Sequence, residues 1–145
     1  MERPEAADPA ERTMPQFTVL LADDESHVTL VMARAVRAAG LEVVTAEDGE
    51  EAYELASEHR PDLIVTDLQM PYMSGIDLAR KLAEHKELGQ IPVILLSARG
   101  YVVENEAKNL ANIRVVIEKP FSAREVLARI HELLAESQGE LRRTA

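Results

Sequence analysis

The chain has 145 residues and a formal net charge of −10, with 26 acidic against 16 basic side chains and no cysteine. This length suits one domain with short tails, and the charge argues against nucleic acid or an anionic membrane as the main partner, because phosphates would be repelled. Without cysteine, and without an apolar run near the roughly 20 residues that span a bilayer, disulfides, thiolate chemistry and a transmembrane helix are excluded, and we expect a cytoplasmic protein with protein partners.

The N-terminal part of the chain predicts a tail followed by a strand and a helix. Residues 1–15 contain prolines among charged residues and no apolar periodicity, which predicts a disordered tail. The apolar run 17–22 then ends at two acids, Asp23 and Asp24, and apolar residues at helical spacing follow over 28–39. The first strand therefore delivers two carboxylates to its carboxyl end.

The middle of the chain repeats this pattern. A second strand over residues 41–45 and a helix that Pro61 closes lead to the apolar run 63–66. This run delivers a third carboxylate, Asp67, to its carboxyl end. A loop with a proline, a capping serine and a glycine follows, and residues 76–86 again show helical spacing.

Two further strands complete the pattern. Residues 93–96 predict a strand that ends at Ser97, and residues 113–117 predict a strand shortly before Lys119. We predict a weaker helix between them over residues 102–111, and a serine-capped amphipathic helix after the last strand.

These elements predict an open, doubly wound α/β sheet of five parallel strands with five helices. The strands are continuous apolar runs, which are typical of parallel strands covered by helices on both faces. We expect the domain to cover residues 16–137 and a frayed tail over 138–145. The site of such a sheet lies outside the carboxyl ends of its strands. The residues expected to converge there are Asp23, Asp24, Asp67, Ser97 and Lys119.

The residue types at this edge predict phosphoryl transfer. Carboxylates placed together raise one another's pKa unless a cation intervenes, and oxygen ligands without histidine or cysteine suit Mg²⁺. A cation, the Lys119 ammonium and the Ser97 hydroxyl around one carboxylate would position a phosphoryl group and neutralise its charge. Asp67 can itself be the acceptor and form an acyl phosphate.

Four motifs, in this order and spacing, resemble the receiver domain of bacterial two-component response regulators, of the single-domain chemotaxis or sporulation type. The resemblance covers about residues 17–136 and implies a flavodoxin-like sheet with strand order 2-1-3-4-5, an order for which we rely on the resemblance alone. The motifs are the acidic pair in Leu21-Ala22-Asp23-Asp24-Glu25, the run Val65-Thr66-Asp67-Leu68-Gln69-Met70-Pro71 with Gly75 beyond it, Ser97-Ala98, and Lys119-Pro120-Phe121.

The resemblance also implies a role for each acidic residue. Asp67 would accept a phosphoryl group from a histidine kinase or a histidine phosphotransfer protein. Asp24 and Asp67 would bind Mg²⁺ directly, together with the backbone carbonyl of Gln69. Asp23 would act on the metal through water.

The remaining motif residues, and two departures from the family pattern, concern the signal. By resemblance, Ser97 would turn toward the phosphoryl oxygen, Lys119 would pair with the phosphate, and the bond from Lys119 to Pro120 would be cis. Receivers commonly carry Tyr or Phe three residues before the lysine, where this chain has Val116, and a common Gly-Ala-Asp turn is replaced by residues 111–113. Both departures leave phosphoacceptance intact and affect signal output.

We therefore interpret the chain as a single-domain response regulator. It would be a phosphoacceptor switch rather than an enzyme, and would signal by a conformational shift to a downstream protein as a monomer or weak dimer. One alternative is a receiver-fold interaction module without a switch, which Val116 favours. The other is a phosphohydrolase with Asp67 as nucleophile, although the haloacid dehalogenase type needs a second aspartate where this chain has Gln69.

Overall fold

The computed structural model describes residues 16–98, 105–107 and 109–144. The fourth predicted helix, over 102–111, falls largely outside these residues, although 105–107 are helical. No helix among the described residues is both long and apolar enough to cross a membrane. The elements are β1 (Thr18–Ala22), α1 (Ser26–Ala38), β2 (Glu42–Ala46), α2 (Gly49–His59), β3 (Leu63–Asp67), α3 (Gly75–Ala83), the 3-10 helix η3 (Leu88–Gln90), β4 (Val93–Ser97), β5 (Ile113–Glu118) and α5 (Ala123–Thr144).

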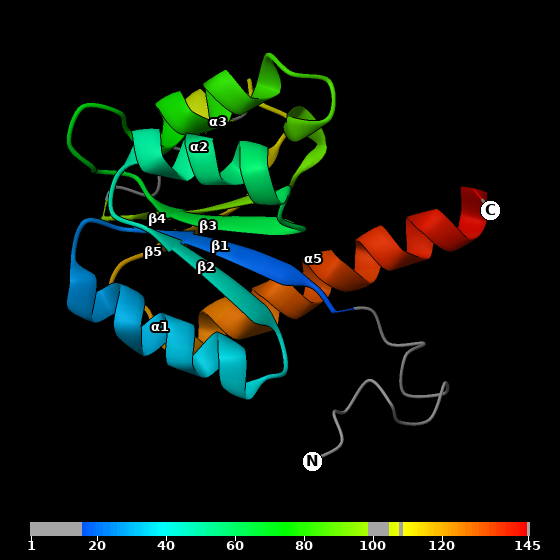
Figure 1. Ribbon diagram of the computed structural model, residues 1–145, viewed down its shortest axis with the longest axis horizontal. Helices are drawn as coiled ribbons and strands as arrows, with labels where there is room; N and C mark the ends of the chain where they lie inside the picture. The colour runs from blue at the N-terminus through cyan, green and yellow to red at the C-terminus, as the bar shows by residue number, and fades with distance from the viewer. Residues whose placement is uncertain (1–15, 99–104, 108, 145) are drawn as a thin grey trace.

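The five strands form one parallel sheet in the order β2-β1-β3-β4-β5, between two layers of helices (Figure 1). Helices α1 and α5 cover one face, and α2 and α3 cover the other. This arrangement confirms the predicted doubly wound fold and its strand order. Parallel pairing also aligns the carboxyl ends, because Ala22 lies opposite both Ala46 and Thr66, and Asp67 lies opposite Leu96.

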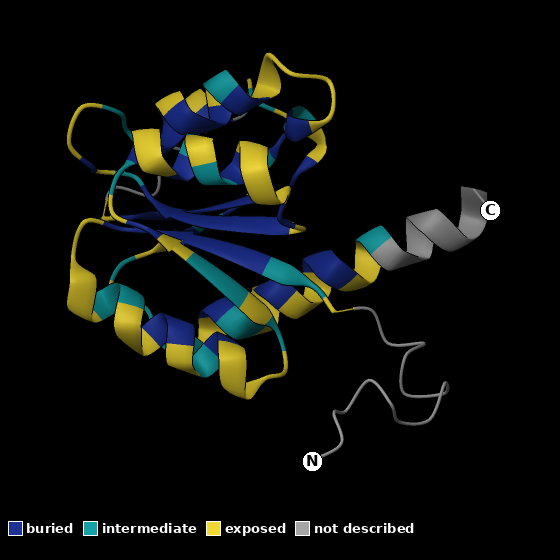
Figure 2. Ribbon diagram, viewed as in Figure 1, coloured by how far each residue is buried: buried dark blue, intermediate teal, exposed yellow. Residues whose placement is uncertain are grey.

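The core lies on both sides of the sheet, and the central strands are buried throughout (Figure 2). Side chains alternate between the two faces, so Val19 and Leu21 of β1 pack with α1 and α5, whereas Leu20 packs with α2 and α3. Burial on both faces explains why these strands are continuous apolar runs in the sequence.

Local hydrogen bonds set the starts of the helices. Asp48 accepts a hydrogen bond from the Glu51 backbone N–H at 2.8 Å at the start of α2, and Ser74 forms a capping box with Asp77 at the start of α3. The predicted cap of the last helix is confirmed, since the Ser122 hydroxyl accepts from the backbone N–H three residues later at 3.1 Å.

Two helix ends differ from the sequence-based expectation. Helix α3 ends at Ala83, not at residue 86, because the chain folds back over its last turn: a Cβ on Gly89 would lie only 3.1 Å from the Ala83 Cα. Helix α5 continues to Thr144, past residue 137, where we placed the limit of the domain. The domain limits themselves stay a prediction.

Candidate functional site

The carboxyl edge of the sheet gathers the polar side chains that follow the strands. Carboxylate oxygens of Asp23, Asp24 and Asp67 all lie within 4.8 Å of one another. They come from the loop after β1 and from the last residue of β3, two strands that are neighbours in the sheet. The predicted convergence therefore follows from parallel strands that end together.

The buried Asp67 carboxylate forms an ion pair with Lys119, which is partly exposed. The Lys119 Nζ atom lies 2.6 Å from the Asp67 Oδ1 atom, and Asp67 is only 4% exposed. Burial raises the pKa of Asp67, and the hydrogen bond and charge of Lys119 offset this only in part. Burial alone would lower the pKa of Lys119, but its contact with Asp67 outweighs that effect and raises it. The contact thus favours the charged form of Lys119, whereas burial disfavours the ionised form of Asp67.

Asp23 contains the least satisfied polar atom of the site. Its Oδ1 atom accepts a hydrogen bond from the Glu25 backbone N–H at 2.9 Å, but its Oδ2 atom is buried with no hydrogen-bond partner among the described residues. Burial raises the pKa of Asp23 to about 6, and the nearby charge of Asp67 adds to this rise. A buried, unpaired carboxylate oxygen beside two other carboxylates suits a bound cation.

The ligand types in this cluster fit Mg²⁺. All three side chains offer hard oxygen atoms, and the cluster contains no histidine, which favours magnesium over zinc. Gln69 also lies beside the site, since its backbone N–H donates a hydrogen bond that lowers the pKa of Asp67. Its backbone carbonyl stays a predicted ligand.

Ser97 and Lys119 are joined through the main chain. Ser97 ends β4 and is buried, and its carbonyl oxygen accepts a hydrogen bond from the Lys119 backbone N–H at 2.8 Å. The expected cis bond between Lys119 and Pro120 is present. Pairing of β4 with β5 therefore places the hydroxyl and the ammonium at the same edge as the three carboxylates.

Comparison with known families agrees with this geometry. The profile of the response regulator receiver domain matches residues 19–131. The chain belongs to the receiver domain family. The predicted family and fold are therefore both confirmed.

Known receivers and regulators show the extent of the similarity. The receiver is 38% identical over 120 residues to the transcriptional regulatory protein SrrA of Staphylococcus aureus, covering 83% of this chain and 48% of that protein. It thus spans about half the length of the curated relatives it matches. Among solved structures, chemotaxis protein CheY4 of Vibrio cholerae superposes with a TM-score of 0.76 at 26% identity, covering 81% of this chain and 98% of the other. The receiver domain of the Francisella response regulator 1452 gives 0.76 at 30% identity, with 84% and 99% covered.

A glycine lets the β3–α3 loop of the receiver close tightly over Asp67. The Gly75 backbone N–H donates to the Leu68 carbonyl at 2.8 Å. A Cβ at Gly75 would lie 2.5 Å from the Asp67 carbonyl oxygen and 2.6 Å from a Leu95 methyl carbon, which is too close for any side chain. The sequence marks this glycine as part of a motif, and the structure supplies the steric reason for it.

Tyr72, in the same loop, is a residue that the sequence does not single out. Its side chain is 99% exposed and its φ angle is 68°, a backbone conformation that residues with a side chain rarely adopt. A tyrosine between a proline and a methionine carries no signal of such a conformation.

Val116 occupies the position where receivers commonly carry an aromatic ring. It lies in β5 opposite Leu95 and packs on a small aliphatic cluster. No aromatic side chain belongs to this cluster among the described residues. The cluster consists of Ile76, Leu95, Leu68, Leu110, Ile113 and Val116.

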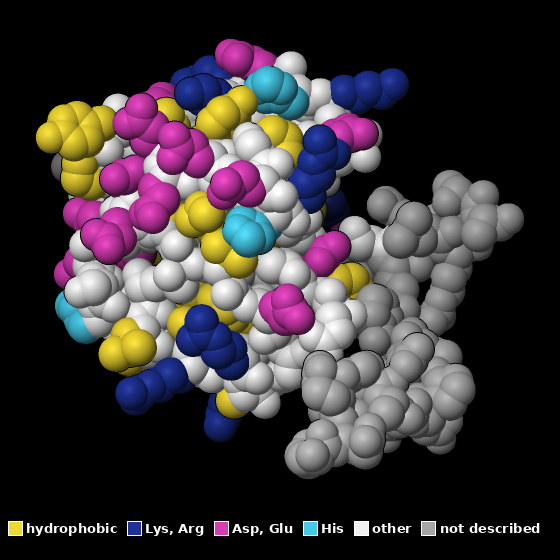
Figure 3. All heavy atoms as spheres, viewed as in Figure 1, with side chains coloured by type: hydrophobic (Ala, Val, Ile, Leu, Met, Phe, Trp, Pro, Cys, Tyr) yellow, Lys and Arg dark blue, Asp and Glu magenta, His cyan; other side chains and the backbone are white. Residues whose placement is uncertain are grey.

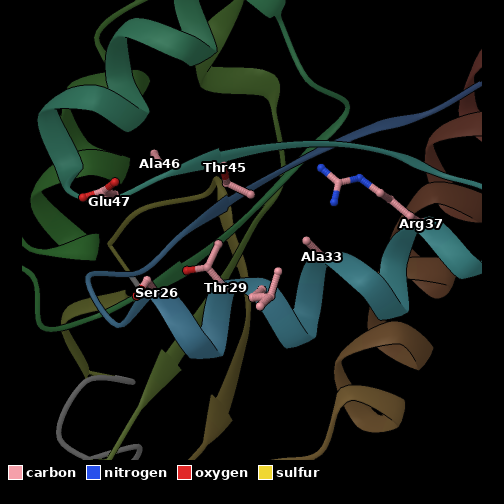
Figure 4. Close-up of a pocket in the computed structure, with 8 residues that line it drawn as sticks. Ser26, Thr29, Ala33, Arg37, Thr45, Ala46 and Glu47 are labelled. Atoms are coloured by element: carbon pink, nitrogen blue, oxygen red, sulfur yellow. The ribbon is translucent and has the colours of Figure 1, made fainter.

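A separate hollow of about 220 Å³ lies between α1 and β2 (Figure 4). Thr29 and Thr45 face it, with Arg37 toward one end and Glu47 at the other. None of the carboxylates of the acidic cluster lines it. This hollow is therefore distinct from the acidic cluster at the carboxyl edge of the sheet.

Proposed function

We propose that this receiver accepts a phosphoryl group on Asp67 from a phosphohistidine of a sensor kinase or phosphotransfer protein, with Mg²⁺ bound. It would act in the cytoplasm and pass the signal to a downstream protein. The observation that carries this proposal is the buried Asp67 carboxylate, which lies 2.6 Å from the Lys119 ammonium and beside the carboxylates of Asp23 and Asp24.

The reaction is a transfer between two nucleophiles. A carboxylate oxygen of Asp67 attacks the phosphorus atom, an O–P bond forms as the N–P bond of the phosphohistidine breaks, and the imidazole leaves with the electron pair of that bond. The Lys119 ammonium neutralises charge on a phosphoryl oxygen. Its contact with the Asp67 carboxylate raises its pKa, which favours the protonated form before the transfer.

The carboxylates hold the metal in this proposal. Asp24 and Asp67 would be direct ligands, together with the Gln69 carbonyl, and Asp23 would act through water. When bound, Mg²⁺ supplies positive charge opposite the phosphoryl oxygens. Asp23 fits this task because its buried Oδ2 atom lacks a hydrogen-bond partner among the described residues.

The phosphoryl group would act as a switch through its charge. It carries about −1.5 to −2 charges at neutral pH, and because the acyl phosphate replaces the single negative charge of the Asp67 carboxylate, the site gains about one negative charge. The Ser97 hydroxyl is expected to turn toward a phosphoryl oxygen, and the altered contacts would shift an existing two-state equilibrium. The site residues favour this switch over a phosphohydrolase that turns over external phosphoesters, because Gln69 stands where a hydrolase of the haloacid dehalogenase type carries its second aspartate.

Incubation with acetyl phosphate and Mg²⁺, followed by intact mass measurement, tests the proposal. We expect one phosphoryl adduct, which chelation of the metal prevents and Asp67→Asn abolishes. The matched control is Asp62→Asn, since Asp62 is exposed and lies just before the other end of β3.

Two outcomes would contradict the proposal. No adduct under any condition would favour an interaction module without a switch. Rapid multiple turnover of p-nitrophenyl phosphate would instead favour a phosphohydrolase with Asp67 as nucleophile.

A further inference from the structure

Tyr72 is displayed at the edge of the sheet where Asp67 lies. Its side chain is 99% exposed, against 57% for Val31 and 52% for Leu30, the other exposed large hydrophobic residues in the described part of the chain. Tyrosine has a large apolar ring and is normally at least partly covered. A fully uncovered ring on the loop that follows Asp67 is typical of a binding surface.

The backbone holds this ring outward. The Met73 backbone N–H donates to the Pro71 carbonyl at 2.7 Å, so Tyr72 is the central residue of a γ-turn with φ at 68°. This turn is rare and strained for a residue with a side chain. Such strain persists only where the surrounding structure enforces it, and it clusters at functional sites.

Contacts on both sides enforce the turn. The loop is closed at its base by the hydrogen bond from Gly75 to Leu68 at 2.8 Å. Its tip packs against the start of α2, where a Cβ on Gly49 would lie 2.8 Å from the Met73 Cβ. Tyr72 is therefore presented by a packed loop rather than by a loose one.

Acidic side chains lie beside this loop. Figure 3 shows hydrophobic side chains standing out over the β3–α3 loop, with acidic side chains over the neighbouring start of α2. Glu47 and Glu50 stand two residues before and one residue after Gly49, are exposed, and take part in none of the ion pairs found among the described residues. The charge complementary to this surface is positive.

We propose that Tyr72 is an anchor for the protein that delivers the phosphoryl group, and that its ring receives an Arg or Lys side chain of that donor. This inference rests on the proposed function, because a donor must approach Asp67 from outside the carboxyl ends of the strands, where the loop lies. A cation is attracted to the face of a tyrosine ring. Glu47 and Glu50 add long-range attraction for the same basic surface.

The test compares a protein donor with a small one. The probes are acetyl phosphate and a panel of purified, autophosphorylated sensor kinases, from which the fastest donor is chosen. Tyr72→Ala should slow transfer from the kinase about 10- to 30-fold, the size of an interface anchor, and leave the rate with acetyl phosphate unchanged. Tyr72→Phe, which keeps the ring, should stay close to the wild-type rate with both donors.

Ionic strength tests the charge of the partner. Transfer from the kinase should slow as salt is raised, and Glu50→Gln should weaken this dependence. The matched control is Glu58→Gln, near the other end of α2, which should keep the wild-type dependence. Equal salt dependence in the wild type and Glu50→Gln would overturn the assigned charge of the partner.

Each result of the donor comparison has one meaning. A wild type that neither acetyl phosphate nor any kinase labels would refute the proposed function itself. If acetyl phosphate labels the wild type, three results would refute only the anchor. These are a Tyr72→Ala variant that changes neither rate, one that slows both rates equally, and a panel in which no kinase acts as a donor. A concentration-dependent dimer that Tyr72→Ala abolishes, measured by sedimentation, would assign the surface to a second copy of the chain and also refute the anchor.

Discussion

The interior of the sheet and its carboxyl edge differ in how many buried polar and charged groups they contain and in how well these groups are hydrogen-bonded. Strands β3 and β4 are buried along their whole length, and before their carboxyl ends their side chains are apolar except for Thr66, whose hydroxyl donates to the Asp67 carbonyl at 3.0 Å. At the edge, Asp23 and Asp67 are buried carboxyls with raised pKa values, and Asp23 Oδ2 has no hydrogen-bond partner in the described structure. The interior thus stabilises the fold, whereas the edge is charged at a cost in stability. Substitutions in the two regions should therefore change stability in opposite directions.

The largest expected effect is in the interior. Ile94 is completely buried in β4 between two neighbouring strands, so Ile94→Ala should lower the free energy of unfolding by about 2 to 5 kcal/mol through lost burial and the cavity left behind. Urea unfolding without metal measures this change. Val31→Ala, at an exposed position of α1, should stay within about 0.5 kcal/mol of the wild type. Equal losses of stability at the two positions would show that burial in the sheet interior does not stabilise the fold more than an exposed position does.

The opposite sign is expected at the edge. Burial lifts the pKa of Asp23 from 3.8 to about 6, so between these values the folded state holds a proton that the unfolded state releases. The free energy of unfolding of the metal-free protein should therefore fall as pH rises from about 4 to 6 and level off above. The loss amounts to about 1 to 3 kcal/mol.

Asp23→Asn tests this origin of the pH dependence. The variant should be more stable than the wild type at pH 7 and flatter between pH 4 and 6, as measured by thermal unfolding in chelator. Glu58→Gln, which changes an exposed carboxylate on α2, should keep the wild-type slope. A loss of stability at pH 7 in Asp23→Asn would show that this carboxylate supports the fold.

The smallest effect concerns the strained loop. Tyr72→Gly should stabilise the protein by about 1 kcal/mol, because glycine adopts a positive φ angle freely and the exposed ring buries almost nothing. Tyr72→Ala keeps the strain and should give no such gain. Equal stability of these two variants in urea unfolding would show that the turn is not strained.

Sequence patterns predict those structural features that are set by residues close together in the chain. The five strands, the cap at Ser122 and the convergence of Asp23 with Asp67 all follow from local patterns and from the rules for parallel sheets. The end of α3 does not, because the return of the chain at Gly89 sets it. Neither do the unpaired Asp23 oxygen and the φ angle of Tyr72, which depend on ångström-scale packing between segments. Residue chemistry alone indicates that the Lys119 ammonium and the Ser97 hydroxyl would position a phosphoryl group, whereas the turn of Ser97 toward a phosphoryl oxygen is implied only by the family resemblance.

The hydrogen bond from the Lys119 backbone N–H to the Ser97 carbonyl has a mechanical consequence. It couples the main chain at Ser97 to the main chain at Lys119, so that the ends of β4 and β5 move together. If a phosphoryl oxygen drew either side chain toward it, the ends of both strands would be displaced. Leu95 and Val116 lie opposite each other two residue pairs before Ser97 and Glu118, so a displacement of the main chain there would reach the aliphatic cluster without the rotation of any ring.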